Sequence, residues 1–214
     1  MTAKSKRPYH APSRQAAAAE TRDAIVAAAK RSFETRGWSG ATMAGIAADA
    51  EVSQKTVEAL FGTKPTLLKA AVDYAIRGDA GPTPIRRREV STQMEAAPRA
   101  AAMLDLHAAH LRRVNERAAA LTWVVEQAAR SDPRVAALWD EINRNREDGV
   151  RWAAKTLLDK PDTDHLDAPT AERIFWVALD WGTYRLLTEH AGLSADQYQQ
   201  WIADYYRRMF SLAT

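Results

Sequence analysis

The sequence predicts an all-α protein. Alanine is abundant, and runs in which valine, isoleucine and threonine alternate with polar residues, as they do in strands, are few. Apolar residues instead recur three and four positions apart, which is the spacing of one face of a helix. Serine, threonine and aspartate stand just before several of these periodic runs, where they can cap a helix. With 214 residues, the chain has room for one large or two small domains.

The composition excludes several kinds of protein. The chain has no cysteine, so disulfides and thiolate metal sites are excluded. No stretch approaches 18 consecutive apolar residues, and no apolar segment follows the basic N-terminus, so we expect neither a membrane span nor a secretory signal. The formal net charge of +3 is only mildly basic. We therefore expect a cytoplasmic protein without a membrane partner.

The basic charge is concentrated at the N-terminus. Residues 1–18 hold two prolines, several small residues and no acid, and we expect them to form a disordered arm. Such an arm suits phosphates or the minor groove of DNA, although a solvated tail has the same composition. Its cations are Lys4, Lys6, Arg7 and Arg14.

A first helix is predicted from about residue 19 to residue 36, with Gly37 ending it. Its buried stripe is predicted to hold Ile25, Ala28, Ala29 and Phe33.

Two short helices joined by a tight turn are predicted at about residues 42–49 and 53–61. Thr42 and Ser53 can cap them, because a hydroxyl oxygen accepts a backbone N–H group that the helix start leaves unpaired. The inner faces are predicted to hold Met43, Ile46, Ala47, Val57, Leu60 and Phe61. The outer face of the second helix is predicted to hold Gln54, Lys55, Thr56 and Glu58.

A short helix with an apolar back and a polar front fits the major groove of DNA, where helix-turn-helix proteins place their reading helix. An ordinary helical hairpin whose polar face meets water has the same pattern. The basic N-terminus, the preceding helix and the long helical remainder favour the DNA-binding interpretation.

The rest of the chain is predicted to be helical as well. A fourth helix follows at about residues 63–76, and a segment rich in glycine and proline at residues 78–84 marks a domain boundary. We therefore expect a DNA-binding domain at 19–80 and a larger domain at 81–214. In the larger domain we expect a helix from about residue 99, broken near residues 116–117, and further helices at about 133–158, 170–190 and 195–212.

The N-terminal pattern resembles the TetR family of bacterial regulators. That family has an apolar helix ending in Phe-x-x-x-Gly-aromatic, followed by Thr, Ile-Ala, Ala-Gly-Val-Ser, Thr-aliphatic-Tyr, Phe, Ser-Lys and Leu-Leu. The resemblance extends over about residues 20–76. The matching residues are Phe33, Gly37, Trp38, Thr42, Ile46, Ala47, Ala50, Val52, Ser53, Thr56, Val57, Phe61, Lys64, Leu67 and Leu68.

Three residues depart from the family pattern. Glu51 stands where the turn usually has glycine, Glu58 replaces the tyrosine that commonly touches a phosphate, and Leu60 replaces a neighbouring histidine or tyrosine. Because a carboxylate repels phosphate, Glu58 must point away, pair with a cation such as Lys55, or accept from a cytosine N4 amine.

The resemblance implies roles for single residues. Thr42, Thr56 and Lys64 are expected to contact the DNA backbone and so position the protein on it. Gln54 and Lys55 are expected to read bases. Ser53 caps the reading helix, whose first N–H groups can also meet a phosphate.

The resemblance also implies a homodimer formed by the last two helices, which would read two half-sites about 34–36 Å apart or a multiple of it. The same side chains could instead belong to the core of one chain. The residues expected in the dimer interface are Ile174, Val177, Trp181, Tyr198, Trp201, Ile202, Tyr205 and Met209.

An unidentified small-molecule effector is expected in the C-terminal domain, where six of the seven tryptophans lie. Aromatic walls with a few polar groups are typical of ligand pockets. The candidate residues are His110, Trp123, Gln127, Trp152 and Trp176.

We therefore expect a ligand-responsive transcriptional regulator, a repressor that binds a palindromic operator in double-stranded DNA. The alternative is a helical small-molecule-binding protein with weak or lost DNA binding. No catalytic spacing or phosphate-binding glycine loop occurs, so we expect no enzyme and no cofactor. His107 and His110 share a helix face without a third ligand, which predicts no metal site.

Overall fold

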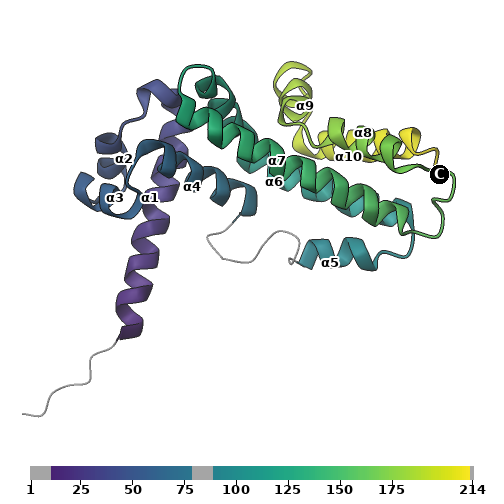
Figure 1. Ribbon diagram of the computed structural model, residues 1–214, viewed down its shortest axis with the longest axis horizontal. Coiled ribbons are helices and arrows are strands. Elements are labelled where there is room, and N and C mark those ends of the chain that lie inside the picture. The colour runs from purple at the N-terminus through teal and green to yellow at the C-terminus, as the bar shows by residue number, and fades with distance from the viewer. Residues whose placement is uncertain (1–10, 79–88, 213–214) are drawn as a thin grey trace, which may run out of the picture. The chain divides into compact units, whose positions relative to one another are not determined.

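The computed structural model describes residues 11–78 and 89–212, and every regular segment within those ranges is helical (Figure 1). This confirms the predicted all-α class. The chain divides into two compact units, of which the first ends at Ala71 and the second begins at Val72. The division falls inside a helix, whereas the predicted boundary between residues 80 and 81 lies outside the described residues.

The N-terminal unit contains the predicted helices. They are α1 (Ala11–Gly40), α2 (Met43–Asp49), α3 (Gln54–Phe61) and the first part of α4 (Lys64–Arg77). Gly37 interrupts the helical path of α1 with a φ of 65°, which confirms the predicted helix end. The core is built from Ile25, Phe33, Ile46, Val57, Phe61, Leu67 and Leu68.

α1 begins at Ala11, eight residues before the predicted start. Residues 11–18 are therefore helical, where the sequence predicted a disordered arm. The remaining arm residues, 1–10, lie outside the described part of the chain. An alanine-rich run favours helix wherever no tertiary contact opposes it, which accounts for the longer helix.

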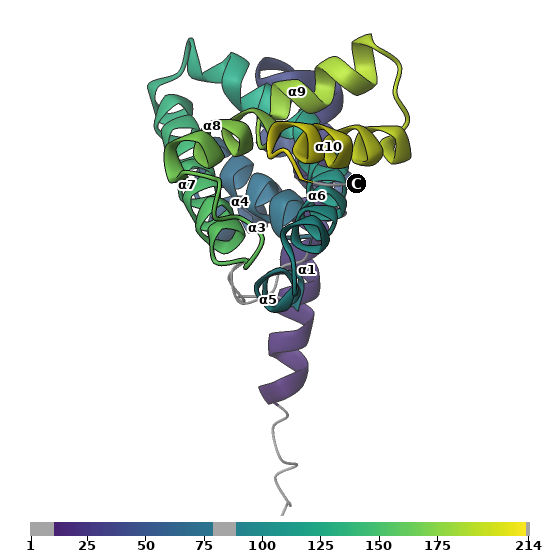
Figure 2. The ribbon, with the colours of Figure 1, turned by 90° about the vertical axis from the view of Figure 1, so that its right-hand side faces the viewer.

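The C-terminal unit packs its helices around α6. The elements are α5 (Glu89–Ala96), α6 (Ala100–Ala129), α7 (Pro133–Leu158), α8 (Ala168–Ala178), α9 (Trp181–Arg185), the π-helix η2 (Leu186–His190) and α10 (Ala195–Met209). Figures 1 and 2 show α8 and α10 on one side of the α6–α7 pair and α5 on the other. α10 begins at the residue predicted, and a capping box of Ser194 and Gln197 fixes its start.

Two predictions for this unit were wrong. α6 runs without a break through residues 116–117. The guanidinium of Arg117 has a polar partner within the helix bundle, because its Nε donates to the carbonyl oxygen of Ala75 in α4 at 3.0 Å. The predicted helix at 170–190 is divided into α8, α9 and η2. Asp180 starts the second piece by accepting a hydrogen bond from the backbone N–H of Thr183 at 3.2 Å.

None of the helices described at residues 11–78 and 89–212 is long and apolar enough to cross a bilayer.

Candidate nucleic-acid interface

The two short helices α2 and α3 form a capped helix-turn-helix. The Thr42 hydroxyl accepts from the backbone N–H of Gly45 at 3.0 Å, and the Ser53 hydroxyl accepts from that of Thr56 at 3.1 Å. Both predicted caps are therefore present. Each satisfies one of the N–H groups that a helix start leaves unpaired, and this fixes where each helix begins.

The turn between α2 and α3 is tight. Glu51 takes the left-handed conformation with a φ of 55°, and the N–H of Val52 donates to the carbonyl oxygen of Ala47 at 3.0 Å. This conformation favours glycine, so the backbone of Glu51 is strained in the turn. The geometry of the turn is kept despite the substitution.

The back of α3 packs into its unit. Val57 and Phe61 are buried, and the guanidinium of Arg22 in α1 lies 4.5 Å from the centre of the Phe61 ring. This cation–π contact ties the end of α3 to α1. The prediction that Leu60 shares this inner face was wrong, because its side chain is 39% exposed.

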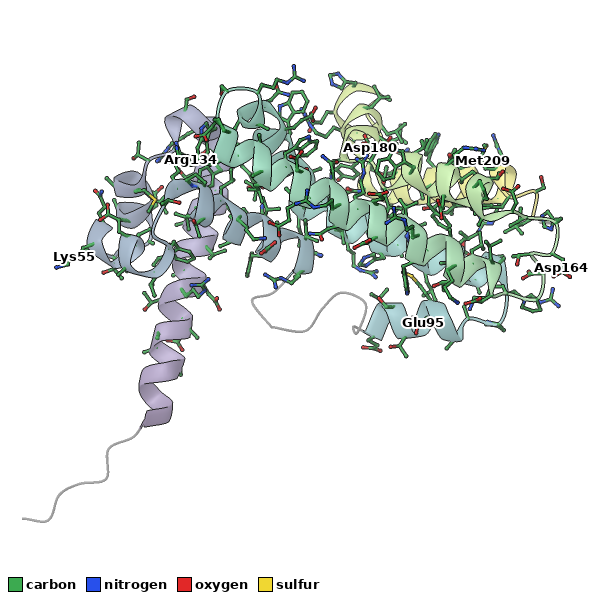
Figure 3. All side chains as sticks on the ribbon, in the orientation of Figure 1. Lys55, Glu95, Arg134, Asp164, Asp180 and Met209 are labelled. Carbon is green, nitrogen blue, oxygen red and sulfur yellow. The ribbon has the colours of Figure 1, made fainter. Side chains whose placement is uncertain are left out.

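The front of α3 is exposed. Gln54, Lys55 and Glu58 are all accessible, and Thr56 is partly buried with its hydroxyl 2.8 Å from that of Ser53. Figure 3 shows the Lys55 side chain pointing away from the helices of its unit. Within the described residues Lys55 has no hydrogen bond or ion pair, so its ammonium is available for a partner.

Glu58 pairs with Gln54. The alternative that it pairs with Lys55 was wrong. The Nε2 amide of Gln54 donates to Oε1 of Glu58 at 2.6 Å, one helical turn apart. The contact links two residues of the front into one polar group. It leaves the second carboxylate oxygen of Glu58 uncommitted.

Lys64 lies at the start of α4 and is turned toward its own unit. Its ammonium donates to the backbone carbonyl oxygen of Trp38 and lies 4.2 Å from the centre of the Trp38 ring. Trp38 in turn stacks on Phe33 with ring centres 6.1 Å apart. The sequence predicted a contact of Lys64 with DNA but did not predict this anchoring of α4 on α1.

Of the predicted arm contacts, Lys4, Lys6 and Arg7 lie outside the described residues, and Arg14 belongs to a helical stretch of α1.

The predicted dimer residues separate into two groups. Ile174, Tyr198 and Ile202 are buried in the core of their own unit, which favours for them the alternative of a core within one chain. Tyr198, for example, accepts a hydrogen bond from the Asn115 side chain at 2.9 Å. The others are accessible to different degrees. Val177 is 47%, Trp201 39% and Met209 50% exposed, and Trp181 and Tyr205 are partly buried.

The predicted ligand residues do not converge on one cavity. The Arg185 guanidinium covers the exposed Trp123 ring at 4.1 Å, that of Arg146 covers Trp176 at 4.2 Å, and Trp152 donates from Nε1 to Glu95 at 3.2 Å. Gln127 is exposed and His110 partly buried. A groove of about 600 Å³ between α7 and α8 includes only Trp176 of this set.

The centre of the C-terminal unit is filled by an aromatic cluster. His107 is buried, with Nδ1 2.8 Å from the Tyr206 hydroxyl and its ring edge-on to Phe175 at 5.1 Å. Burial, aided by nearby His110, lowers the pKa of His107 to about 3, so its ring is neutral. The described residues contain no group of three or more candidate metal ligands.

Comparison with known proteins assigns the helix-turn-helix. Residues 25–71 match the model of the family described as bacterial regulatory proteins, tetR family. No curated protein is similar to the chain in sequence.

Solved structures share the fold of nearly the whole chain. One TetR-family transcriptional regulator, from a Rhodococcus species, has a TM-score of 0.66 at 17% identity and covers 89% of this chain and 98% of its own. A second, from Mesorhizobium loti, has a TM-score of 0.64 at 18% identity and covers 91% and 97%. A third, from Streptomyces coelicolor, has a TM-score of 0.56 at 20% identity and covers 87% and 98%. At these identities the likeness concerns the fold.

Proposed function

Residues 25–71 belong to the tetR family of bacterial regulatory proteins, and from this premise we propose that the chain represses transcription by binding an operator in double-stranded DNA. The observation that carries the proposal is the front of α3. It exposes Gln54, Lys55 and Glu58 on a helix whose start is capped by Ser53 and whose back is fixed by Val57 and Phe61. A helix held in this way can enter the major groove without rearrangement.

The start of α3 offers a second feature that suits DNA. The first N–H groups of a helix carry partial positive charge and bind phosphate, and the hydroxyls of Thr42, Ser53 and Thr56 lie at the two helix starts of the motif. Hydroxyl and N–H donors of this kind set the register of a protein on the duplex, whereas side chains on the front read the bases.

We propose that the active form is a homodimer. Val177 on α8 and Trp201 and Met209 on α10 are large apolar side chains that water reaches in the single chain. Trp201 also stacks flat on Tyr205, with ring centres 5.5 Å apart, which presents a rigid aromatic surface. Apolar, aromatic and methionine side chains are enriched in interface cores, so these residues support a contact between two copies.

We propose that a small molecule bound in the C-terminal unit controls DNA binding. The groove between α7 and α8 has the volume of a typical ligand site, with Val150, Pro169 and Trp176 as apolar wall and Glu147, Arg151, Glu172 and Arg173 as charged groups. α4 belongs to both compact units, so a shift of its C-terminal part is a direct route between them. The effector can act only through its difference in affinity for two states.

Selection of bound sequences from a pool of genomic duplex fragments tests the function. The proposal predicts enrichment of a palindrome whose half-sites lie about one helical turn, or a multiple of it, apart. The carboxylate of Glu58 on the front of α3 favours one alternative, a small-molecule-binding protein that no longer binds DNA. Stabilisation by a small molecule without any enriched sequence would support that alternative.

A further inference from the structure

We propose that Glu58 determines which base the protein selects, by accepting a hydrogen bond from the N4 amine of a cytosine in each half-site. This inference rests on the proposed DNA binding and adds the identity of one base pair to it. It starts from the contact between Gln54 and Glu58, which the sequence pattern did not specify.

The geometry holds the Glu58 carboxylate on the front of α3. Gln54 donates to Oε1 at 2.6 Å, and both side chains are exposed. With Oε1 engaged, Oε2 is the atom available to a ligand. The one cation of α3, Lys55, makes no ion pair with Glu58, so the charge of the carboxylate is not neutralised by its own helix.

A carboxylate in this position is selective because it accepts hydrogen bonds and donates none. In the major groove guanine presents only acceptors, and thymine an acceptor and a methyl group. Adenine presents an amine beside the N7 acceptor, which repels the charge. Cytosine presents the N4 amine without a neighbouring acceptor. Of the four bases, cytosine is thus the one that satisfies Oε2.

The neighbouring lysine reinforces this choice. Lys55 follows Gln54 on the first turn of α3, and lysine donates to O6 and N7 of guanine. Every C·G pair offers the cytosine amine and these guanine acceptors side by side. A front that combines the Glu58 acceptor with the Lys55 donor therefore matches C·G pairs better than A·T pairs.

The test is sequence selection from random duplexes with the wild type, Glu58→Gln and Glu58→Ala, followed by affinity measurements on single-base variants of the selected site. For the wild type we expect cytosine at one position of each half-site, preferred about tenfold over the other bases. Glutamine binds adenine through N6 and N7, so Glu58→Gln is expected to shift that position to adenine. Glu58→Ala is expected to reduce the preference below about twofold while the half-site spacing stays the same.

Glu51→Gln serves as the matched control, because it removes a carboxylate from the turn and leaves the front of α3 intact. It should retain the cytosine preference. Thermal unfolding of each variant establishes that it is folded. An enriched palindrome without a preferred cytosine, or one whose preference survives in Glu58→Gln, would overturn the inference and leave the proposed function standing. A wild type that enriches no duplex would overturn both.

Discussion

Glu51 illustrates how a single residue can carry a local cost within a well-formed motif. Its φ of 55° lies in the left-handed region, where a side chain crowds the backbone. The family pattern has glycine at this position, and the departure was visible in the sequence. The turn itself forms because Val52 and Ala50 keep their backbone hydrogen bonds to α2.

Glu51→Gly is therefore expected to stabilise the protein by about 0.5–1 kcal/mol, since relief of left-handed strain exceeds the extra chain entropy of glycine. Urea unfolding measures this difference as a shift of the midpoint. Glu51→Ala removes the same charge but keeps the Cβ, so it should give no such gain. Equal stability of the two variants would show that the charge, and not the backbone, matters here.

His107 is a residue whose environment strongly alters its chemistry. It lies in the aromatic cluster with Phe175 and Tyr206, and burial lowers its pKa to about 3 from an ordinary value of 6.5. The folded state thus holds it neutral, while the unfolded chain takes up a proton near pH 6.5. The stability that depends on the neutral ring is complete above pH 6.5 and is lost as the pH falls from there toward 3.

For the wild type we expect the free energy of unfolding to fall more steeply between pH 6.5 and 4 than for His107→Gln. The glutamine variant keeps a polar partner for the Tyr206 hydroxyl but has no proton to bind. One group contributes at most about 1.4 kcal/mol per pH unit to this slope. Denaturant unfolding at several pH values measures it, and parallel curves for the two proteins would refute the role of His107.

At the residue scale the sequence predicted helix caps better than side-chain contacts. The caps Thr42 and Ser53 are predictable because each contact joins residues only three positions apart. The Gln54–Glu58 and Lys64–Trp38 contacts depend on rotamers and on residues up to 26 positions away, which spacing does not encode. Leu60 was placed inside because its spacing from Val57 is helical, although α3 is buried only along Val57 and Phe61.

The helices themselves were predictable where local signals and packing agree. α2 and α3 begin at the predicted caps, and α7 begins at the predicted residue 133. The break after α8 was missed, although Asp180 three residues before Thr183 is a capping pattern. What fixes the break is tertiary, since Arg146 of α7 binds the Asp180 carboxylate at 2.6 Å and stacks on Trp176. The helical pattern of residues 170–190 does not indicate this contact, because Arg146 lies 34 positions before Asp180.

A comparison of two helix caps separates the effect of capping on stability from its effect on DNA binding. Ser53→Ala and Asp132→Ala each remove a side-chain oxygen that accepts a backbone N–H, from Thr56 at 3.1 Å and from Arg134 at 2.9 Å respectively. Each is expected to cost about 1 kcal/mol of unfolding free energy. Only Ser53→Ala should also weaken DNA binding, because the proposed DNA-binding surface is the front of α3. Equal loss of affinity in both variants would assign the effect to general instability.

For the whole molecule, the division into a helix-turn-helix unit and a larger helical unit follows from the segment rich in glycine and proline at residues 78–84 and from the helical patterns on either side of it. The assembly of two copies does not, because the same apolar spacing describes a core and an interface. Ile174, Tyr198 and Ile202 turned out to be core, whereas Val177, Trp201 and Met209 are exposed. Only the packing of α8 and α10 against their own unit distinguishes the two sets.

Val177→Glu is expected to convert the proposed dimer into a monomer, because it would place a charge in the apolar contact between the two copies. Analytical ultracentrifugation at micromolar concentration measures the change. Ala120→Glu, at an exposed position of α6, is the control and should stay dimeric. A wild type that is monomeric at these concentrations would contradict the proposed assembly.

The most direct test of the central claim is the salt dependence of binding to the selected duplex. The account predicts that affinity falls roughly a hundredfold between 50 and 200 mM salt, as about four neutralised phosphates would give. Lys55→Ala should weaken binding about tenfold, whereas Lys155→Ala, a solvent-exposed change on α7, should not. Binding that is absent or independent of salt, or that is unchanged in Lys55→Ala, would contradict the claim that the front of α3 binds DNA.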